Sequence, residues 1–550
     1  MITFAITNNR LFMFTTFYTK LIRPLAVTLL VSSLFPSCSE YEFAYLYEDL
    51  PFEMSKVQRP QIPLREVSIT DFGGVGDGIF LNSEAFATAI DALSKSGGGR
   101  LTVPTGVWLT GPITLLDNIE LHIKPDAVLL FSTDRSLYPI IETVFEGLDT
   151  RRCIAPINAD GAKNIAITGG GTIDGNGDSW RQVKKSKIAP GLWKNLLTSG
   201  GFTNSTGDIW YPDSSSFRGS IVSDAFNVPQ GLTSDQEWED VKTYLRPVLI
   251  GLKDCENVLL EDCLFQNSPC WNIHPLMCKN VIINNIRVRN PWYSQNGDGL
   301  DVDSCEDVLV VNSSFDVGDD AICIKSGKNE DGRRRARPCK NLIIDNCIVF
   351  HGHGGFVVGS EMSGGVENIK VSNCQFLGTD VGLRFKSCRG RGGIVKNIFI
   401  EDIVMMNIPT EPLLFDLHYE GKSAVEVAES GKSIYDVAAM PVDETTPQFR
   451  DIFIKDIVCS GAARAMYFNG IPEMNVENIV VEDCEIVSVR GAELRYSTDV
   501  RLENVNITQS EGEGYILANC TNVDLVDCQD ASRAESPQVY QHNNTNIFIK

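Results

Sequence analysis

The sequence predicts an all-β fold, a parallel β-solenoid in which each turn of the coil is one short repeat. The first observation is a recurring unit in which Asn or Asp is followed by alternating apolar residues, a period-two pattern that is typical of strands. The second is that this unit returns after 23, 27, 34, 27 and 29 residues between positions 257 and 397, so its loops vary in length. The third is that cysteines fall at fixed places in the unit.

The repeat continues from the first hundred residues almost to the end of the chain. Residues at equal phase should stack, because each turn of such a coil lies about 4.8 Å above the last. The marker positions that define the phase are Asn118, Asn164, Asn257, Asn280, Asp307, Asn341, Asn368, Asn397, Asp451, Asn478, Asp499 and Asn522.

The cysteines follow the same phase. Those six residues after a marker are Cys263, Cys347, Cys374, Cys484 and Cys528, and those two residues before one are Cys255, Cys278, Cys305, Cys339 and Cys520. A cysteine that recurs at one phase is expected to be a small, buried stacking residue, although some stacked pairs could be oxidised. No C-x-x-C pair of the kind that holds zinc occurs in the sequence.

Length and charge narrow the function classes. The 550 residues could form several domains or one long repeat domain. With 48 Lys and Arg against 71 Asp and Glu, the formal net charge is −23, which argues against a nucleic-acid partner because phosphate binding needs a basic surface. A local basic patch could still bind an anionic ligand.

Residues 1–38 read as an export signal, with Lys20 and Arg23 ahead of an apolar run that is too short to span a bilayer. Positions 35–38 read Phe-Pro-Ser-Cys and resemble a bacterial lipoprotein processing site with Cys38 as the lipidated residue; plain secretion is the alternative. We therefore expect an exported protein of the periplasm or the outer membrane of a bacterium, attached to a membrane only through Cys38. Residues 39–66 read as a linker.

Residues 67–550 are predicted to form a single solenoid domain. Residues 67–78 read as a strand followed by a glycine-rich turn, and 82–93 read as a short helix with helical spacing of its apolar residues. The turn meets neither the G-x-G-x-x-G nor the Walker pattern, which argues against nucleotide binding. Short strands follow from residue 97, and insertions near 175–250 and 408–448 interrupt the repeat. Long loops on a rigid repeat are where specificity is usually built.

Four successive turns of the coil can be aligned by their apolar pairs, which should face the interior. These pairs are Leu300/Val302, Ile322/Ile324, Phe356/Val358 and Leu383/Phe385, and the outward-facing sets between them are Asp301/Asp303, Cys323/Lys325, Val357/Gly359 and Arg384/Lys386. The alignment places Asp298 level with Asp320, and Asp319 level with His353. Strict alternation would turn Asp298 and Asp320 inward, so we assume that Gly297, Gly299 and Gly318 turn them outward.

Three carboxylates, an imidazole and two cations are thus expected on one strip of surface. Carboxylates this close repel one another, so the cluster either binds a cation or keeps one carboxyl protonated for acid catalysis.

Four motifs on these adjacent turns resemble those of the polygalacturonases and their relatives, glycoside hydrolase family 28. Residues 296–301 match Asn-x-Asp-Gly-x-Asp, with Gly297 where many members have Thr, and 318–320 match Gly-x-Asp-Asp displaced by one position. Residues 352–354 match Gly-His-Gly, and 384–386 match Arg-Ile-Lys. The resemblance covers roughly residues 67–530 and implies a right-handed parallel β-helix.

The resemblance also implies a reaction, namely hydrolysis of α-1,4-galacturonosidic bonds in pectin with inversion and without a cofactor or a metal. By resemblance, Asp319 is the acid, with a pKa that its neighbours raise, and Asp298 and Asp320 hold the attacking water. His353 orients or tunes Asp319. The substrate-binding residues it implies are Asn296, Arg384 and Lys386. We expect a monomer that acts on pectic polysaccharide or oligogalacturonide.

Several alternatives remain open at this stage. The 175–250 insertion suggests a groove closed at one end, and thus exo action. A rhamnogalacturonan hydrolase, a calcium-dependent pectate lyase that uses the Asp cluster as a metal site, and a non-catalytic glycan-binding solenoid are the competing functions. Seven further residues have two interpretations, contact with sugar or a purely structural position in which they are packed or solvated. They are Trp271, His274, Trp292, Tyr293, Arg333, Arg334 and Arg335.

Overall fold

The computed structural model describes residues 41–223, 227–419, 437–532 and 536–550. The predicted export signal and Cys38 lie outside these residues. The chain divides into two units, Met1–Glu48 and Asp49–Lys550; the described part of the first holds one short helix, η1 (Ala44–Tyr47). Within the described ranges, no helix is both long and apolar enough to cross a membrane.

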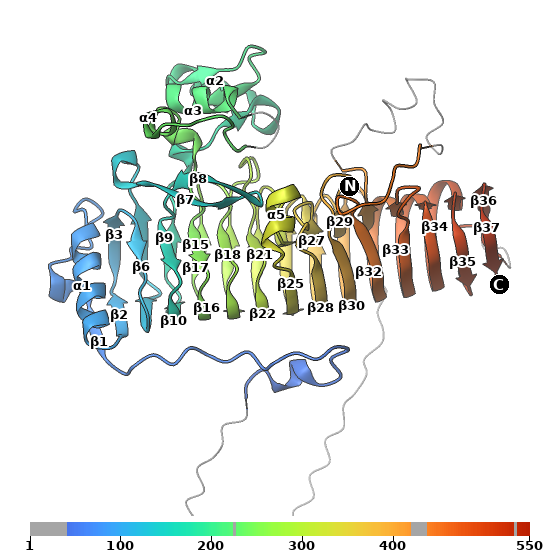
Figure 1. The fold of residues 1–550 in the computed structure, drawn as a ribbon, viewed down its shortest axis with the longest axis horizontal. Helices are drawn as coiled ribbons and strands as arrows, with labels where there is room; N and C mark the ends of the chain where they lie inside the picture. The colour runs from blue at the N-terminus through green and yellow to red at the C-terminus, as the bar shows by residue number, and fades with distance from the viewer. Residues whose placement is uncertain (1–40, 224–226, 420–436, 533–535) are drawn as a thin grey trace, which may run out of the picture. The chain divides into compact units, whose positions relative to one another are not determined.

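The second unit is a parallel β-helix, in which three stacks of strands run alongside one another (Figure 1). The stack that carries the acidic motifs consists of β4 (Ile113–Thr114), β9 (Ile157–Asp160), β15 (Ile250–Lys253), β18 (Ile273–Leu276), β21 (Leu300–Asp303), β24 (Asp320–Lys325), β27 (Gly354–Gly359), β29 (Leu383–Lys386), β31 (Leu413–Asp416) and β36 (Val539–His542).

The second stack follows each marker residue. It consists of β1 (Glu66–Ser68), β2 (Gly99–Val103), β5 (Ile119–Ile123), β10 (Lys163–Thr168), β16 (Glu256–Glu261), β19 (Lys279–Asn284), β22 (Glu306–Val311), β25 (Cys339–Asp345), β35 (Thr521–Val526) and β37 (Thr545–Ile549). The third consists of β3 (Gly106–Thr110), β6 (Ala127–Phe131), β11 (Thr172–Asp174), β17 (Leu264–Gln266), β20 (Arg287–Arg289), β23 (Ser314–Asp316) and β26 (Ile348–His351). Longer strands bend through more than one stack: β28 (Val366–Leu377), β30 (Ile394–Ile408), β32 (Gln448–Asn469), β33 (Val476–Arg495) and β34 (Ser497–Ala518).

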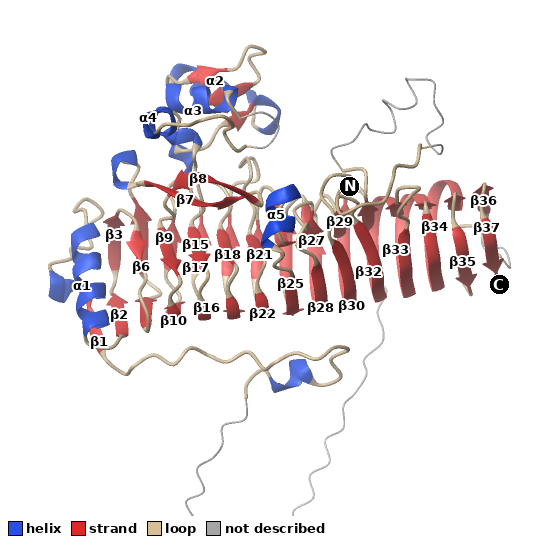
Figure 2. Ribbon diagram, viewed as in Figure 1, coloured by secondary structure: helices blue, strands red, loops and turns tan. Residues whose placement is uncertain are grey.

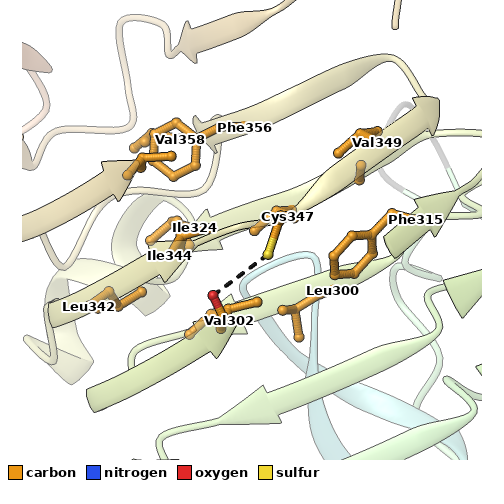
Figure 3. Packing of buried hydrophobic residues seen from close by; sticks show 14 of the residues in the cluster. Leu300, Val302, Phe315, Ile324, Leu342, Ile344, Cys347, Val349, Phe356 and Val358 are labelled. Atoms are coloured by element: carbon orange, nitrogen blue, oxygen red, sulfur yellow. Dashed lines mark hydrogen bonds between the residues drawn. The ribbon is translucent and has the colours of Figure 1, made fainter. Parts of the chain in front are cut away.

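The register predicted for the four aligned turns is confirmed. Leu300 pairs with Ile322, Ile322 with Phe356, and Phe356 with Leu383. All eight apolar residues of the alignment are fully buried in one continuous core. Figure 3 shows such side chains from successive strands packed against each other in the interior. Burial at about 25 cal/mol per Å² of apolar surface makes this core the main source of stability.

The marker residues make the turns possible. Each of the twelve has a positive φ, which asparagine and aspartate tolerate better than other side chains. Their amides also hydrogen-bond from one turn of the coil to the next. For example, Asn368 donates to Oδ1 of Asn341 at 3.0 Å and accepts from Nδ2 of Asn397 at 3.2 Å. The polar residues that mark the repeats in the sequence therefore form a hydrogen-bonded ladder in the structure.

The phase-locked cysteines are buried thiols, as their phase predicts, and none of them is oxidised. They donate to backbone carbonyls of the same or the preceding turn. The Cys347 thiol, for example, lies 3.6 Å from the carbonyl oxygen of Val310. The stacked cysteines therefore serve packing.

The remaining helices cap or decorate the coil (Figure 2). Helix α1 (Ser83–Lys95) lies over 82–93, where a helix was predicted, and buries Phe86, Ile90 and Leu93 in the core. The other elements outside the stacks are the hairpin β7 (Ile140–Phe145) and β8 (Leu148–Cys153); the short strands β12 (Val183–Lys184), β13 (Phe202–Thr203) and β14 (Ile209–Tyr211); the helices α2 (Pro190–Thr198), α3 (Ser214–Ile221), α4 (Asp235–Asp240) and α5 (Asn329–Arg335); and the 3₁₀ turns η2 (Ile69–Phe72), η3 (Arg135–Leu137), η4 (Gly177–Ser179), η5 (Lys185–Lys187) and η6 (Lys242–Tyr244).

The two predicted insertions differ in extent. The first lies between β11 and β15 and contains α2, α3 and α4. The second was expected to begin at 408, but β31 still pairs with β29 there, so the coil continues through Asp416. Part of this second insertion, 420–436, lies outside the described residues.

Substitutions of Asn368 separate the two contributions of a marker residue to stability, namely its side-chain hydrogen bonds and its tolerance of a positive φ. Replacing Asn368 with Ala should lower the free energy of unfolding by about 2–3 kcal/mol, since it removes two hydrogen bonds and puts a Cβ-bearing residue in the left-handed region. Replacing it with Gly removes only the hydrogen bonds and should cost less. Denaturant unfolding of both variants tests this, and equal losses would contradict a conformational role for the marker.

Candidate active site

Five of the seven predicted site residues line a small pocket over β21, β24, β27 and β29, and the other two, Arg384 and His353, contact Asp320 and Asp319 beside it. Its cavity volume is about 170 Å³. The predicted residues in its lining are Asn296, Asp298, Asp319, Asp320 and Lys386. Other segments complete the wall, and the residues they supply are Glu146, Asn227, Trp271, Lys325, Lys328, Ser360, Glu361 and Tyr419. Glu146 stands at the tip of the β7–β8 hairpin, and Asn227 belongs to the first insertion, so both extra segments close over the motifs.

Asp298, Asp319 and Asp320 come together as the alignment predicts. One carboxylate oxygen from each lies within 4.8 Å of the others. Asp298 is buried, and its Oδ1 has no hydrogen-bond partner in the part of the chain that the structure describes. Burial, together with the carboxylates of Asp319 and Asp301, raises the pKa of Asp298 well above its usual range. Of these three carboxyls, Asp298 is therefore the one whose surroundings favour the protonated form.

Asp320 has the opposite environment. Lys386 Nζ lies 2.7 Å from one of its oxygens, and Arg384 Nη1 lies 3.2 Å from the other. Burial opposes ionisation, but these two cations and Lys325 lower the pKa of Asp320 below its usual range. The Tyr419 ring covers both cations, at 4.9 Å from Lys386 Nζ and 5.6 Å from Arg384 Cζ. Asp320 is thus an ionised carboxylate with both oxygens engaged.

Asp319 is paired with His353. His353 Nδ1 lies 3.1 Å from Oδ1 of Asp319. Burial opposes ionisation of Asp319, yet the hydrogen bond and the charge of His353 lower its pKa, and the same hydrogen bond raises the pKa of His353. The expectation that repulsion raises the pKa of Asp319 is therefore wrong for the ligand-free site, because the imidazole outweighs the neighbouring carboxylates.

The other ring nitrogen of His353 faces the first insertion. Lys187 Nζ, on η5, lies 3.2 Å from His353 Nε2, and Asp380 Oδ2 lies 3.8 Å from it. Nothing in the repeat pattern points to Lys187, since it lies 166 residues from His353 in a segment without a motif. Only the folded chain reveals it as a site residue.

The strip of outward-facing residues is covered, which corrects the expectation of an exposed surface. Asp301, Asp303 and Lys325 are all buried. Lys325 Nζ lies 3.5 Å from Asp301 and 3.0 Å from Glu361, and its ammonium lies 4.7 Å from the centre of the Trp271 ring. Burial raises the pKa of Asp301, whereas Lys325 and Lys328 hold the pKa of Glu361 below its usual range despite burial. Strand alternation predicts which face a side chain takes but not what covers that face.

The glycines of the acidic motifs do not turn Asp298 and Asp320 outward through a left-handed backbone, as expected from the sequence. None of Gly297, Gly299 and Gly318 has a positive φ; the left-handed residue of the turn is Asn296, at φ 52°. The glycines are required by close approach instead. A Cβ on Gly297 would lie 1.7 Å from the Ser294 hydroxyl oxygen, and one on Gly318 would lie 2.6 Å from the Pro291 carbonyl oxygen.

The remaining candidates separate into packed and exposed residues. Asn296 accepts from Arg246 at 2.9 Å, and Trp271 and His274 are buried with their rings 5.1 Å apart. Trp292, by contrast, is 59% exposed. The arginine run of α5 is tied down by Arg333 contacts to Gly390 and Arg391, by the Arg334–Asp149 ion pair at 2.6 Å, and by Arg335 bonding to Gly147. It braces the β7–β8 hairpin.

The three carboxylates are close enough to share a cation, but their partners suit a cation poorly. Both oxygens of Asp320 already bind positive side chains, and Asp319 binds His353. A divalent ion would be repelled by Lys386 and Arg384 and would have to displace them. The donor set fits a proton-sharing cluster better than a calcium site.

Comparison with known proteins agrees with this geometry. The sequence profile of glycosyl hydrolases family 28 matches residues 234–460. The crystal structure of a hyperthermoactive exopolygalacturonase from Thermotoga maritima is similar to this chain at 32% identity, with a TM-score of 0.65, and covers 87% of this chain and 95% of its own. The predicted parallel β-helix is confirmed by this likeness.

Two sequence relatives point the same way. A probable polygalacturonase of Vitis vinifera is 29% identical over 76% of this chain and 74% of its own length. An exo-poly-alpha-D-galacturonosidase of Dickeya chrysanthemi is 28% identical over 64% of this chain and 57% of its own length.

The raised pKa of Asp298 predicts that replacing this carboxyl with a neutral group stabilises the protein. Replacing Asp298 with Asn should raise the free energy of unfolding at pH 7 by about 1 kcal/mol or more, because Asn stands in for the neutral carboxyl and removes the cost of keeping it neutral. The group's pKa is raised on folding, so the penalty grows as pH rises above the unfolded value of 3.8. The difference from wild type should vanish below about pH 4 in unfolding titrations.

Asp319 provides the control of opposite sign. Its pKa is lowered in the folded protein, so its ionised form contributes stability that is present above the unfolded value and is lost as pH falls. Asp319→Asn should therefore be destabilised at pH 7. A stabilised Asp319→Asn, or a destabilised Asp298→Asn, would contradict this distribution of protons.

Proposed function

Since the chain belongs to glycosyl hydrolases family 28 and hydrolyses galacturonosidic bonds in pectin, we propose that it removes galacturonate units from the end of an α-1,4-linked galacturonate chain, with inversion at the anomeric carbon. The observation that carries the proposal is the pairing within one pocket. A carboxyl bonded to an imidazole and a carboxylate clamped by two cations lie beside a third carboxyl that holds a proton.

Asp319 is the general acid in this proposal. The cluster holds one proton, which rests on Asp298 in the ligand-free site. A substrate carboxylate that binds Arg384 and Lys386 adds negative charge beside Asp319 and Asp320 and weakens the hold of the cations on Asp320, and this raises the pKa of both carboxyls toward that of Asp298. The proton then passes to Asp319, the only member of the three that is part-exposed and so reaches the leaving oxygen. Such carboxyls titrate as a coupled set.

The base is the pair formed by Asp298 and Asp320. After the proton has moved, both are ionised and can hold a water between them. The water attacks the anomeric carbon and gives its proton to this pair, while the bond from that carbon to the glycosidic oxygen breaks and the oxygen takes the proton of Asp319. The carboxyl oxygens lie within 4.8 Å, closer than the spacing of about 6.5–9.5 Å that is usual for inverting enzymes.

Inversion is proposed despite that spacing because none of the three carboxyls suits a nucleophile. Both oxygens of Asp320 are held by cations, and Asp319 is held by His353. Asp298 has a free oxygen, but its proton makes it a poor nucleophile. Proton NMR of the first-formed product decides the question: the β-anomer supports inversion, and the α-anomer contradicts it.

The binding of a uronate carboxylate follows from the charge of the pocket wall. Arg384 and Lys386 are adjacent on one face of β29, and Tyr419 holds them in place. A guanidinium beside an ammonium suits a planar carboxylate better than a neutral sugar. A rhamnogalacturonan hydrolase would gain nothing from this pair unless galacturonate occupied the same position.

Exo action is supported by the segments that close the pocket. The tip of the β7–β8 hairpin is anchored by Lys328, whose backbone N–H donates to Gly147 at 3.1 Å, and by the Arg334–Asp149 ion pair. The first insertion reaches His353 through Lys187. With walls on these sides, a chain end fits the pocket better than the middle of a polymer. Export of the protein, with a lipid on Cys38, completes the proposal because pectin is an external polymer.

Asp319 offers the direct test of the mechanism. Asp319→Asn should lower kcat on polygalacturonate by about 10²–10⁴-fold with little change in KM, because it removes proton donation and leaves binding in place. Reducing-sugar assays measure this, with Asp524→Asn, a half-exposed carboxylate far along the coil, as the control. Full activity of Asp319→Asn would overturn the assignment. An unsaturated product lost with chelator would instead indicate a lyase.

Lys187 tests whether the insertion belongs to the site. Lys187→Met should raise KM for trigalacturonate by about tenfold, as expected for the loss of one charged contact. It should also move the alkaline limb of the pH profile upward, because Lys187 lowers the pKa of His353. Lys185→Met on the same short turn is the matched control. If both variants behave as wild type and galacturonate is not the main product, exo action through this insertion is wrong.

A further inference from the structure

A second polar site lies on the outer face of the third stack. The last residues of β11, β17, β20, β23 and β26 form one row across five successive turns of the coil: Asp174, Gln266, Arg289, Asp316 and His351. Together with Asn267, Asn290, Pro291 and Trp292 they line a groove of about 710 Å³. None of these residues lines the catalytic pocket.

The row is shaped by an irregularity in the sheet. Phe315 pairs with Val349, but Asp316 pairs with His351, so Phe350 is an extra residue and the register shifts. A one-residue shift reverses the face that a side chain takes, and bulges commonly re-aim side chains in this way. Here the bulge brings His351 Nδ1 to 2.9 Å from Asp316 Oδ1. Without it, the apolar Phe350 would stand in the row.

One member of the row lacks a partner. Asp174 accepts from Gln266 and Asn267, at 2.8 and 3.2 Å, and Asp316 is bonded to His351. The guanidinium of Arg289, between them, makes no hydrogen bond or ion pair within the described ranges, although the protein carries a net charge of −23 and is rich in carboxylates. Beside it, Trp292 is 59% exposed. An unpaired guanidinium and an exposed aromatic ring next to amide and imidazole groups form a binding surface for an anionic sugar.

We propose that this groove binds a galacturonate segment of the pectic polysaccharide outside the catalytic pocket. Arg289 would hold one uronate carboxylate, Trp292 would cover a sugar face, and Gln266 would bond to hydroxyls. The choice of pectin as the occupant rests on the proposed function; the unpaired guanidinium of Arg289 and the exposed ring of Trp292 are observed independently of it.

The groove and the catalytic pocket belong to the same turns of the coil. Arg289 is followed directly by the loop that carries Asn296 and Asp298, and Asp316 precedes Asp319 by three residues. A polymer can therefore occupy the groove while an end of it, or of a neighbouring chain, enters the pocket. We expect a trisaccharide in the pocket to use the groove less than a long chain does, so the groove should matter most for long substrates.

Arg289→Gln is the decisive variant, and Arg287→Gln is its matched control. Both arginines are exposed on β20 and lie on the same face, but only Arg289 lines the groove. Arg289→Gln should raise KM for polygalacturonate and weaken its binding in affinity electrophoresis by about tenfold, and leave kcat and KM for trigalacturonate unchanged. Trp292→Ala should weaken polymer binding in the same assay. Fully methyl-esterified pectin, which lacks free carboxylates, should not distinguish Arg289→Gln from wild type.

The outcomes separate this inference from the proposed function. If wild-type protein releases galacturonate from trigalacturonate and Arg289→Gln binds polymer as tightly as Arg287→Gln, the groove is not a binding site. Equal weakening in both variants would show only non-specific attraction and would also overturn the inference. If wild-type protein cleaves no galacturonate substrate, the proposed function fails, and binding of polygalacturonate by the groove can still be read from electrophoresis alone.

Discussion

The parallel pairing of β21, β24, β27 and β29 is the constraint on which the site depends. It holds Asp320 and the Arg384–Lys386 pair on strands of one ladder and places Asp298 two residues before β21, so their separation depends mainly on strand spacing. Each strand also buries two apolar side chains in the core. A movement of any one of these strands would therefore cost core packing before it changed the geometry of the charges. The site is rigid because the coil beneath it is.

That rigidity allows charges to be buried that would otherwise separate or neutralise. Three carboxylates, Glu361, and the cations Lys325, Lys386 and Arg384 share a region with little exposure to solvent. Each ionised group there has a partner of opposite charge within about one hydrogen bond, which is the condition for burying charge without a large penalty. Among the described residues Asp298 has no such ion pair, and its pKa is raised instead. The arrangement favours reactivity over stability, as functional sites commonly do.

Much of this was predictable from the sequence, and the reason is periodicity. Strand alternation and the marker residues were enough to place Asp298 level with Asp320 and Asp319 level with His353, because neighbours in a solenoid are related by a fixed repeat. The four motifs supplied the expectation of chemistry. The pKa of Asp319, the cover over Asp301 and Lys325, and the contact of Lys187 with His353 were not predictable. Each depends on segments without a repeat, whose position follows from tertiary packing alone.

Those irregular segments also change the electrostatics of the site. The β7–β8 hairpin, α5 and the first insertion exclude water from a strip that the coil alone would expose, and they lower the dielectric around the charges. The attraction of Lys386 and Arg384 for Asp320, and the repulsion felt by Asp298, are strong only because of that cover. The coil sets the spacing of the charged groups, and the insertions strengthen the electrostatic interactions between them. A relative with the same four motifs but without these segments would have the same ladder of residues and a weaker difference in pKa between its carboxyls.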